Sequence, residues 1–140
     1  PPPHLHRPAP PNQVRTAGAK RVEADAVILA TGAEAKWLGL DSEKRLNGSG
    51  VSACAVCDGF FYRNQEVAIV GAGDTACEEA IYLSKLCTTV HMIVRRDEMR
   101  ASKIMQERVL ATKNIKVYWN SETDEVLGGN VVEAVRIHNN

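Results

Sequence analysis

The sequence predicts an α/β fold in which the strands of a parallel sheet alternate with helices. Three observations lead to this prediction: short apolar runs typical of buried strands, stretches with the apolar spacing of helices between them, and glycine-containing turns where one passes into the other. Apolar residues make up 44% of the 140 residues, which is enough for a packed core and too many for a disordered chain. The apolar runs are far too short to span a bilayer, so we expect no membrane segment.

The charged residues are balanced, and this argues against one class of function. Lys and Arg total 17, as do Asp and Glu, so the formal net charge is zero. Bulk charge therefore does not favour nucleic-acid binding, and an aromatic content of 5% disfavours a base-stacking surface. The start of the chain shows no secretory leader, and we expect a cytoplasmic protein without a nucleic-acid partner.

The beginning of the chain is expected to form a tail followed by strands. All six prolines lie within residues 1–11, and we interpret residues 1–13 as a proline-rich tail. Residues 14–16 and 20–31 are predicted strands. The second includes Ala26–Ala30, which is continuously apolar, as expected for a strand covered on both faces.

Turn-forming residues separate these strands from each other and from the rest of the chain. A turn is expected at residues 17–19, and the second strand should end at Thr31-Gly32, where the chain can change direction. The polar, glycine-containing stretch 34–50 then indicates a boundary between two structural units. We place this boundary between residues 45 and 46.

The remainder of the chain has a regular pattern of strands and helices. The predicted strands are Val67–Val70, Val90–Val94, Ile115–Trp119, Glu122–Leu127 and Val131–Ile137. The predicted helices are Asp74–Leu86 and Ser102–Ala111, with Ser102 as the N-cap of the second. The side chains expected to face the core are Ala76, Ala80, Leu83 and Leu86 in the first helix and Ile104, Met105, Val109 and Leu110 in the second. A hairpin turn at Gly128–Asn130 should join the last two strands.

The turn between the first strand and helix of this pattern has the spacing of a dinucleotide-binding loop. Gly71-Ala-Gly73-Asp-Thr-Ala76 matches G-x-G-x-x-G/A, with both flanking elements in place. Gly71 permits the tight turn, Gly73 lets the backbone approach a pyrophosphate, and Ala76 allows close packing of helix on strand. The free N–H groups of the helix N-terminus favour an anion there. The pattern therefore predicts a Rossmann-like nucleotide site.

The end of the next strand indicates which nucleotide is bound. An NAD site usually has an acidic residue there, which bonds the ribose 2′-hydroxyl. This chain has Arg95 and Arg96, with Arg100 close behind, and guanidinium groups suit a 2′-phosphate. Asp97 and Glu98 lie among the arginines and could orient them. These residues favour NADPH over NADH.

Cys54-Ala-Val-Cys57, followed by Asp58, allows three interpretations. A zinc site commonly needs two such pairs, and the remaining cysteines, Cys77 and Cys87, do not form a second one, so we expect no metal. A structural disulfide is disfavoured because the chain shows no other secretory features. A redox dithiol fits best, with Asp58 available as a proton donor and acceptor.

Three segments together resemble the low-molecular-weight thioredoxin reductases. They are Ser52–Gly59 with the cysteine pair, Gly71–Ala76 with the glycine loop, and Arg95–Ala101 with the arginines. Ala30–Ala33 also resembles the turn at the end of that family's FAD domain. The resemblance covers residues 14–140, and the motifs agree in order and spacing.

The resemblance implies a homodimeric flavoenzyme in which NADPH reduces FAD, FAD reduces the cysteine pair, and the pair reduces thioredoxin. It implies that Cys54 attacks the thioredoxin disulfide, Cys57 faces the flavin and Asp58 is the acid/base. It places Gly71, Gly73, Asp74 and Thr75 at the pyrophosphate of NADPH and Arg95, Arg96 and Arg100 at its 2′-phosphate.

The resemblance also implies a domain organisation. Residues 14–45 correspond to a β-strand remnant of an FAD domain, and residues 46–140 to a three-layer NADPH-binding domain with a parallel sheet and a β-meander, without its last strand. We expect little turnover from this chain alone, because most of the flavin site is missing. The alternatives are the flavoprotein of an alkyl hydroperoxide reductase system, which resembles the same family, and a non-enzymatic NADPH-binding module with an unreactive cysteine pair.

Overall fold

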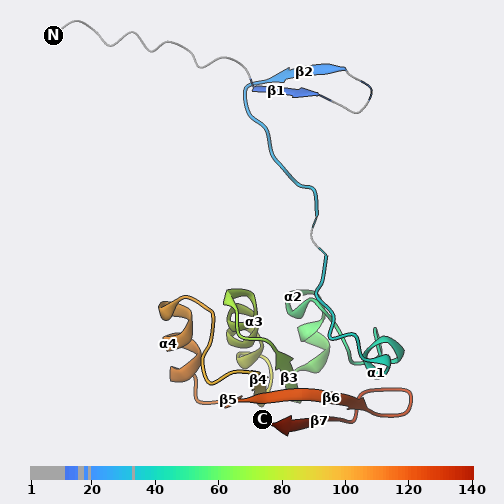
Figure 1. Cartoon of the computed structure of the whole chain (residues 1–140), viewed down its shortest axis with the longest axis vertical. Helices are drawn as coiled ribbons and strands as arrows, with labels where there is room; N and C mark the ends of the chain where they lie inside the picture. The colour runs from blue at the N-terminus through green and yellow to red at the C-terminus, as the bar shows by residue number, and fades with distance from the viewer. Residues whose placement is uncertain (1–11, 16–17, 19, 33) are drawn as a thin grey trace, which may run out of the picture. The chain divides into compact units, whose positions relative to one another are not determined.

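The computed structural model describes residues 12–15, 18, 20–32 and 34–140, which fall into two compact units (Figure 1). The first unit ends at Glu34, and the second comprises Ala35–Asn140. The predicted proline-rich tail lies almost entirely outside the described residues, as does most of the predicted turn at residues 17–19.

The first unit contains a two-stranded antiparallel sheet. β1 (Asn12–Arg15) pairs with β2 (Arg21–Ala24), and Val14 lies opposite Val22. The predicted buried strand at Ala26–Ala30 is wrong, since these residues form no strand and Ile28 and Leu29 are 91% and 86% exposed. A strand buried on both faces needs neighbours on its edges and layers above and below it. Among the described residues of this unit, only β1 and β2 pair with each other.

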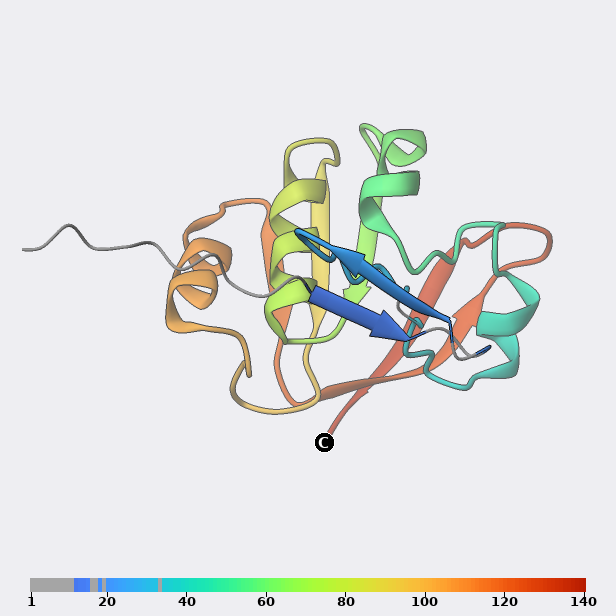
Figure 2. The same ribbon diagram turned by 90° about the horizontal axis from the view of Figure 1, so that it is seen from above.

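The second unit has the predicted α/β architecture. β3 (Glu66–Val70), β4 (Thr89–Ile93) and β5 (Ile115–Tyr118) form a parallel sheet in the order β3-β4-β5. α3 (Asp74–Ser84) connects the first two strands, and α4 (Lys103–Ala111) connects the last two. Both helices cover one face of the sheet (Figures 1 and 2). The parallel α/β class expected from the alternating pattern is therefore confirmed.

An antiparallel hairpin completes the second unit on the other face of the sheet (Figure 1). β6 (Ser121–Leu127) pairs with β7 (Ala134–Asn139), with a register irregularity between Thr123 and Glu125. Helices, sheet and hairpin thus make three layers. The last strand begins three residues later than Val131, because the connection reaches beyond the predicted turn, and Gly128 adopts a φ of 146° at its start.

The core lies between the parallel sheet and its two helices. It consists of Ile69, Cys77, Ala80, Leu83, Cys87, Val90, Met92, Val94, Met99, Ala101, Val109 and Ile115. The predicted core positions Ile104 and Leu110 are wrong, since they are 64% and 61% exposed, and α4 contributes mainly Val109 and the partly buried Met105. α4 packs beside α3, and only one narrow side of it meets the core.

A short helix near the start of the second unit forms hydrogen bonds with the hairpin. α1 (Asp41–Arg45) contacts β6, where the Val126 N–H donates to Ser42 Oγ at 3.0 Å. Arg45 Nη1 donates to the carbonyl oxygens of Gly128 and Gly129 at 3.0 and 2.8 Å. The division between the units therefore comes before α1, earlier than the position between residues 45 and 46 expected from composition.

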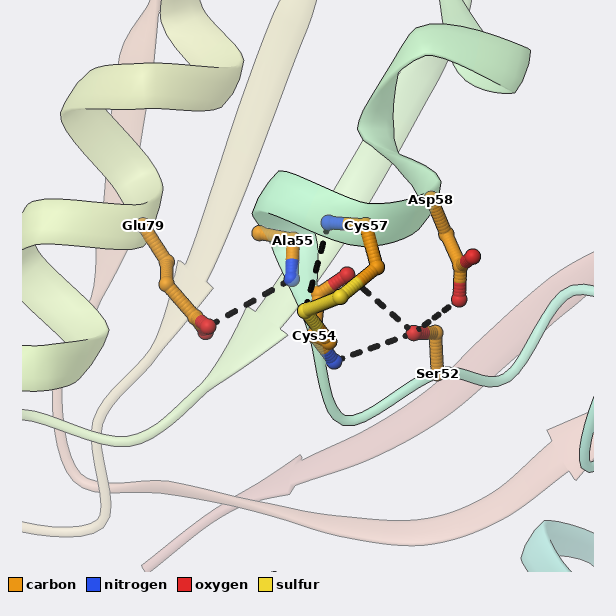
Figure 3. The surroundings of a disulfide bond; sticks show 6 residues. All are labelled: Ser52, Cys54, Ala55, Cys57, Asp58 and Glu79. Carbon is orange, nitrogen blue, oxygen red and sulfur yellow. Dashed lines mark hydrogen bonds between the residues drawn. A yellow bond between two sulfur atoms is a disulfide. The ribbon is translucent and has the colours of Figure 1, made fainter. Parts of the chain in front are cut away.

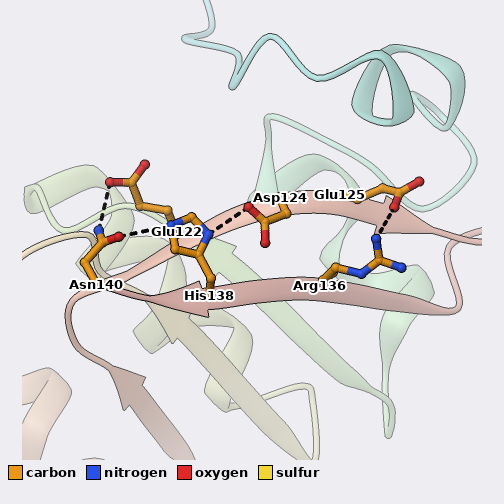
Figure 4. Close-up of polar contacts among 6 residues, drawn as sticks. All are labelled: Glu122, Asp124, Glu125, Arg136, His138 and Asn140. Atoms are coloured by element: carbon orange, nitrogen blue, oxygen red, sulfur yellow. Dashed lines mark hydrogen bonds and ion pairs between the residues drawn. The ribbon is translucent and has the colours of Figure 1, made fainter.

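The far end of the hairpin carries a polar cluster centred on His138 (Figure 4). One ring nitrogen, Nδ1, lies 2.7 Å from Asp124 Oδ1, and Nε2 lies 3.0 Å from Asn140 Oδ1. The Asn140 amide nitrogen donates to Glu122 Oε1 at 3.2 Å. This bond leaves the amide oxygen of Asn140 facing the imidazole. Both ring nitrogens therefore face acceptors, which suits the imidazolium, and the contact with Asp124 raises the pKa of His138.

No helix in the described part of the chain is long and apolar enough to cross a membrane. Likewise, the described residues contain no group of three or more His, Cys, Asp or Glu side chains placed to hold a metal ion.

Candidate functional site

The two predicted cysteines form a disulfide on a short helical turn (Figure 3). Cys54 is the N-cap of α2 (Ala55–Asp58), and Cys57 lies in the helix itself. Their sulfur atoms are bonded, and the Cys57 N–H donates to Cys54 Sγ at 3.2 Å. Cys57 is exposed and Cys54 is half-buried. An N–H aimed at Cys54 Sγ favours the thiolate form of this sulfur once the disulfide is reduced.

A serine that we had not predicted as a site residue links Asp58 to the disulfide. Ser52 Oγ donates to Asp58 Oδ2 at 2.5 Å and accepts the Cys54 N–H at 3.0 Å. Ser52 lies two residues before Cys54, and Asp58 directly follows Cys57, so the whole arrangement is local (Figure 3). The sequence signal for Ser52 is its position two residues before Cys54, where an ST-type turn brings its hydroxyl back to the backbone.

α3 supports the disulfide turn from its other side. Glu79 of α3 accepts the Ala55 N–H at 3.4 Å (Figure 3). The turn continues into a 3-10 helix, η1 (Gly59–Tyr62), which starts at a buried glycine. A Cβ at Gly59 would lie 2.7 Å from the Leu83 side chain, so the absence of a side chain lets the turn approach α3 closely.

The other two cysteines are core residues. Cys77 and Cys87 are buried free thiols. Burial raises the pKa of both thiols, and the nearby Asp74 charge raises the pKa of Cys77 further. A protonated, buried thiol is a poor nucleophile, so only Cys54 and Cys57 are placed for thiol chemistry in the described chain.

The predicted dinucleotide loop has the backbone conformation that its glycines permit. Gly71 adopts a φ of 143°, and a Cβ at this position would lie 3.1 Å from Ala76 Cβ. Gly73 is the N-cap of α3, and no heavy atom lies within 4 Å of the position its Cβ would take. The space beside Gly73 and the free N–H groups at the start of α3 fit an approaching pyrophosphate.

The arginine-bearing loop is fastened to the glycine loop by hydrogen bonds. The Ala72 carbonyl accepts the N–H groups of Arg100 and Ala101 at 2.8 and 3.0 Å. Asp74 Oδ1 accepts both the N–H and the hydroxyl of Ser102, at 2.9 and 2.8 Å. These bonds lower the pKa of Asp74. Ser102 is the N-cap of α4 as predicted, but its hydroxyl binds Asp74 and makes no capping bond to its own helix.

A cleft of about 570 Å³ opens beside these loops, at the carboxyl ends of β3 and β4. It is lined by Lys36, Trp37, Leu38, Leu40, Val70, Gly71, Ala72, Ile93, Val94, Arg95, Arg96, Glu98, Arg100, Ser121, Glu122 and Thr123. Of the predicted cofactor-binding residues, Gly71 and the three arginines therefore share one cleft. Gly73, Asp74, Thr75 and Ala76 lie just beyond Gly71, at the start of α3, and are not part of its lining.

The cleft has a basic surface available to an anion. Its lining has four basic side chains, from Lys36, Arg95, Arg96 and Arg100, and two acidic ones, from Glu98 and Glu122. All three arginines are exposed, and none forms an ion pair in the described part of the chain, even with the neighbouring Asp97 or Glu98. Unpaired guanidinium groups suit a multiply charged phosphate.

Comparison with known proteins now identifies the family. The profile of the pyridine nucleotide-disulphide oxidoreductases matches residues 10–140. The chain belongs to this family. Its resemblance to thioredoxin reductases is also confirmed, since the thioredoxin reductase of Escherichia coli is 52% identical over 117 residues, which cover 81% of this chain and 36% of that protein.

Other relatives in this family carry the same or a different name. A Pseudomonas fluorescens protein named glucosaminate ammonia-lyase is also 52% identical, over 120 residues that cover 83% of this chain and 38% of that protein. The crystal structure of Lactococcus lactis thioredoxin reductase in its FR conformation has a TM-score of 0.76 and 38% identity, covering 86% of this chain and 40% of that one. The chain thus spans about 40% of the length of the relatives it matches.

Proposed function

We propose that this chain is the NADPH-binding and redox-disulfide part of a thioredoxin-disulfide reductase. One observation carries the proposal: a single α/β unit holds a Cys54–Cys57 disulfide linked to a carboxylate and a basic cleft beside a dinucleotide-type glycine loop. The NADPH-dependent thioredoxin reductase activity, the flavin and the homodimer belong to the whole protein and are part of this proposal. So is a cytoplasmic location.

The residues of the cleft fit NADPH in chemistry and in space. The N–H groups at the start of α3 would hold the pyrophosphate next to Gly71 and Gly73, and Arg95, Arg96 and Arg100 would hold the 2′-phosphate. When bound, NADPH supplies a hydride whose electron pair reaches the disulfide through FAD. Of the two cysteines, Cys57 would be the one that faces the flavin.

The cysteine pair performs the thiol exchange. Two electrons and two protons convert the Cys54–Cys57 disulfide to two thiols. The Cys54 thiolate then attacks one sulfur of a thioredoxin disulfide, forms a mixed disulfide and releases the other thioredoxin sulfur as a thiolate. The Cys57 thiolate attacks Cys54 Sγ, releases the second thioredoxin thiolate and re-forms the original disulfide. The N–H of Cys57 aimed at Cys54 Sγ supports Cys54 as the attacking residue.

Asp58 is the general acid and base of this exchange. Its carboxylate is held beside the pair by Ser52, which also binds the Cys54 N–H. A carboxylate at this place accepts a proton from a thiol as the thiolate forms and returns it to the departing thiolate.

The exchange half of this proposal can be tested on the chain itself. The chain, reduced and freed of reductant, is mixed with oxidised thioredoxin, and free thiols on each protein are counted by mass after alkylation. We expect the disulfide to move from thioredoxin to Cys54–Cys57. Cys57→Ser should trap a mixed disulfide through Cys54, and Cys54→Ser should give neither product. Absence of any exchange by the reduced chain would refute the proposal.

A further inference from the structure

The cleft has a second wall that the glycine loop and the arginines do not supply. Lys36, Trp37, Leu38 and Leu40 lie in the segment before α1, and all four line the cleft. None of them belongs to a nucleotide-binding sequence pattern, and nothing in the proposed function uses them. The large side chains of Trp37 and Leu38 are each 46% exposed.

A buried carboxylate holds this wall in place. Glu43 of α1 is only 6% exposed, and its two carboxylate oxygens accept the N–H groups of Leu38 and Gly39 at 3.0 and 2.9 Å. Gly39 takes a φ of 88°, which turns the backbone towards Glu43, and the Lys44 N–H donates to the Leu40 carbonyl at 3.2 Å. The segment is therefore an anchored part of the cleft, and Trp37 directly precedes the anchored residues.

The chemistry of the wall matches the parts of a dinucleotide that phosphate-binding groups leave uncovered. An indole offers a flat, apolar face, which stacks on a purine ring. A lysine ammonium is a compact charge that pairs with phosphate. Indole and ammonium lie next to each other in the chain, and they share a cleft with three unpaired arginines.

We propose that Trp37 stacks on the adenine ring of the nucleotide and that Lys36 adds a fourth cation to the phosphate site. Glu43 is the positioning residue that holds this wall against the cleft. The inference rests on the proposed function, because it takes NADPH-type nucleotides as the ligand.

The test uses the tryptophan itself as the reporter. The chain has two tryptophans, Trp37 in the cleft and Trp119 packed against the core, so Trp119→Phe leaves Trp37 as the single emitter. Adenosine 2′,5′-bisphosphate is titrated into this variant, with fluorescence and calorimetry recorded on the same samples. We expect the Trp37 emission to change and to saturate at the calorimetric Kd. Ribose 5-phosphate, which has no base, should leave the emission unchanged.

Affinity measurements separate stacking from charge. Trp37→Ala should raise the Kd of adenosine 2′,5′-bisphosphate about tenfold, and Trp37→Phe, which keeps a flat ring, should restore most of the affinity. Lys36→Met should raise the Kd less than Trp37→Ala and should make binding less sensitive to salt. Glu43→Gln should move Trp37 emission before any ligand is added, since the amide cannot accept two N–H groups equally well.

The outcomes distinguish this inference from the function on which it rests. If calorimetry shows binding while Trp37 emission and the Trp37→Ala affinity stay unchanged, the wall has no role and the NADPH site stands. If adenosine 2′,5′-bisphosphate does not bind at all, both the NADPH site and the wall are refuted.

Discussion

The disulfide turn and the nucleotide cleft are assembled in opposite ways. All the polar contacts that join Cys54 and Cys57 to Asp58 come from residues 52–58. The cleft instead draws its lining from four segments of the chain, residues 36–40, 70–72, 93–100 and 121–123. A site built by near neighbours depends on local turns, whereas a site built by distant segments depends on the packing of the whole unit. A substitution in the disulfide turn should therefore act only on that turn, whereas a substitution that disturbs the packing of the unit should act on the whole cleft.

The largest effect is expected from removing charge from the cleft. Arg95→Ala combined with Arg96→Ala should raise the Kd of NADPH about a hundredfold, because each of the two guanidinium–phosphate contacts is worth roughly 1.5 kcal/mol. The Kd of NADH should change little, since NADH lacks the 2′-phosphate. Calorimetry with both nucleotides measures the difference. Arg108→Ala, on the exposed side of α4 and outside the cleft, is the matched control.

Equal weakening of NADPH and NADH would contradict the assignment of the arginines to the 2′-phosphate. It would also mean that the cleft responds to charge only through general attraction of anions. The cysteine exchange should be unaffected by these substitutions, since the hydrogen bonds described for the disulfide turn involve none of the arginines.

The next effect tests the local nature of the disulfide turn. Ser52→Ala removes the hydroxyl that binds both Asp58 and the Cys54 N–H, and it should slow exchange with thioredoxin about tenfold, because proton transfer by a misplaced carboxylate is less efficient. NADPH affinity should not change. Stopped-flow measurements of exchange give the rate, and Ser49→Ala is the control. A rate equal to that of the unmodified chain would show that Ser52 has no part in the chemistry.

A smaller effect should follow from loosening the contact between the two loops of the cleft. Asp74→Ala removes the acceptor of both Ser102 bonds, so the arginine loop should become more mobile and the Kd of NADPH should rise about fivefold. Asp74→Asn keeps a side-chain oxygen at this position and should retain most of the affinity. If the two variants behave alike, the hydrogen bonds to Ser102 do not position the arginines.

The smallest effect is a pH dependence of stability in the hairpin layer. Folding raises the pKa of His138 through Asp124, so the folded state favours the charged imidazole. The stabilisation is complete below the ordinary histidine pKa of about 6.5 and is lost as the pH rises through the higher folded value. Thermal unfolding between pH 5 and 9 should show this loss, and His138→Gln should remove it. A stability that rises over this interval in step with His138 would contradict the sign.

The disulfide turn and the parallel sheet were largely predictable from the sequence, for a physical reason. Apolar runs such as Val90–Val94 and the spacing of Ala80 and Leu83 reflect backbone periodicity, which each segment carries by itself. Cys54, Cys57 and Asp58 lie within one helical turn, so their proximity follows from their spacing.

Predictions failed where burial depended on a neighbour outside the segment. Ala26–Ala30 has the composition of a buried strand, yet among the described residues of its unit β1 and β2 pair only with each other. Ile104 and Leu110 have helical spacing, but α4 lies beside α3 and buries only a narrow stripe around Val109. Periodicity shows which residues can face a core and does not show how wide that core is.

The sequence alone determined the α/β class, the glycine loop, the arginine cluster and the cysteine pair with Asp58, because each depends on residues close together in the chain. Only the tertiary structure decided that residues 36–40 and 121–123 line the same cleft as the arginines, that Asp74 fastens the two loops, and that Glu43 anchors Leu38 and Gly39. These contacts join segments through packing and buried hydrogen bonds, and no local pattern records which distant segment a side chain will meet.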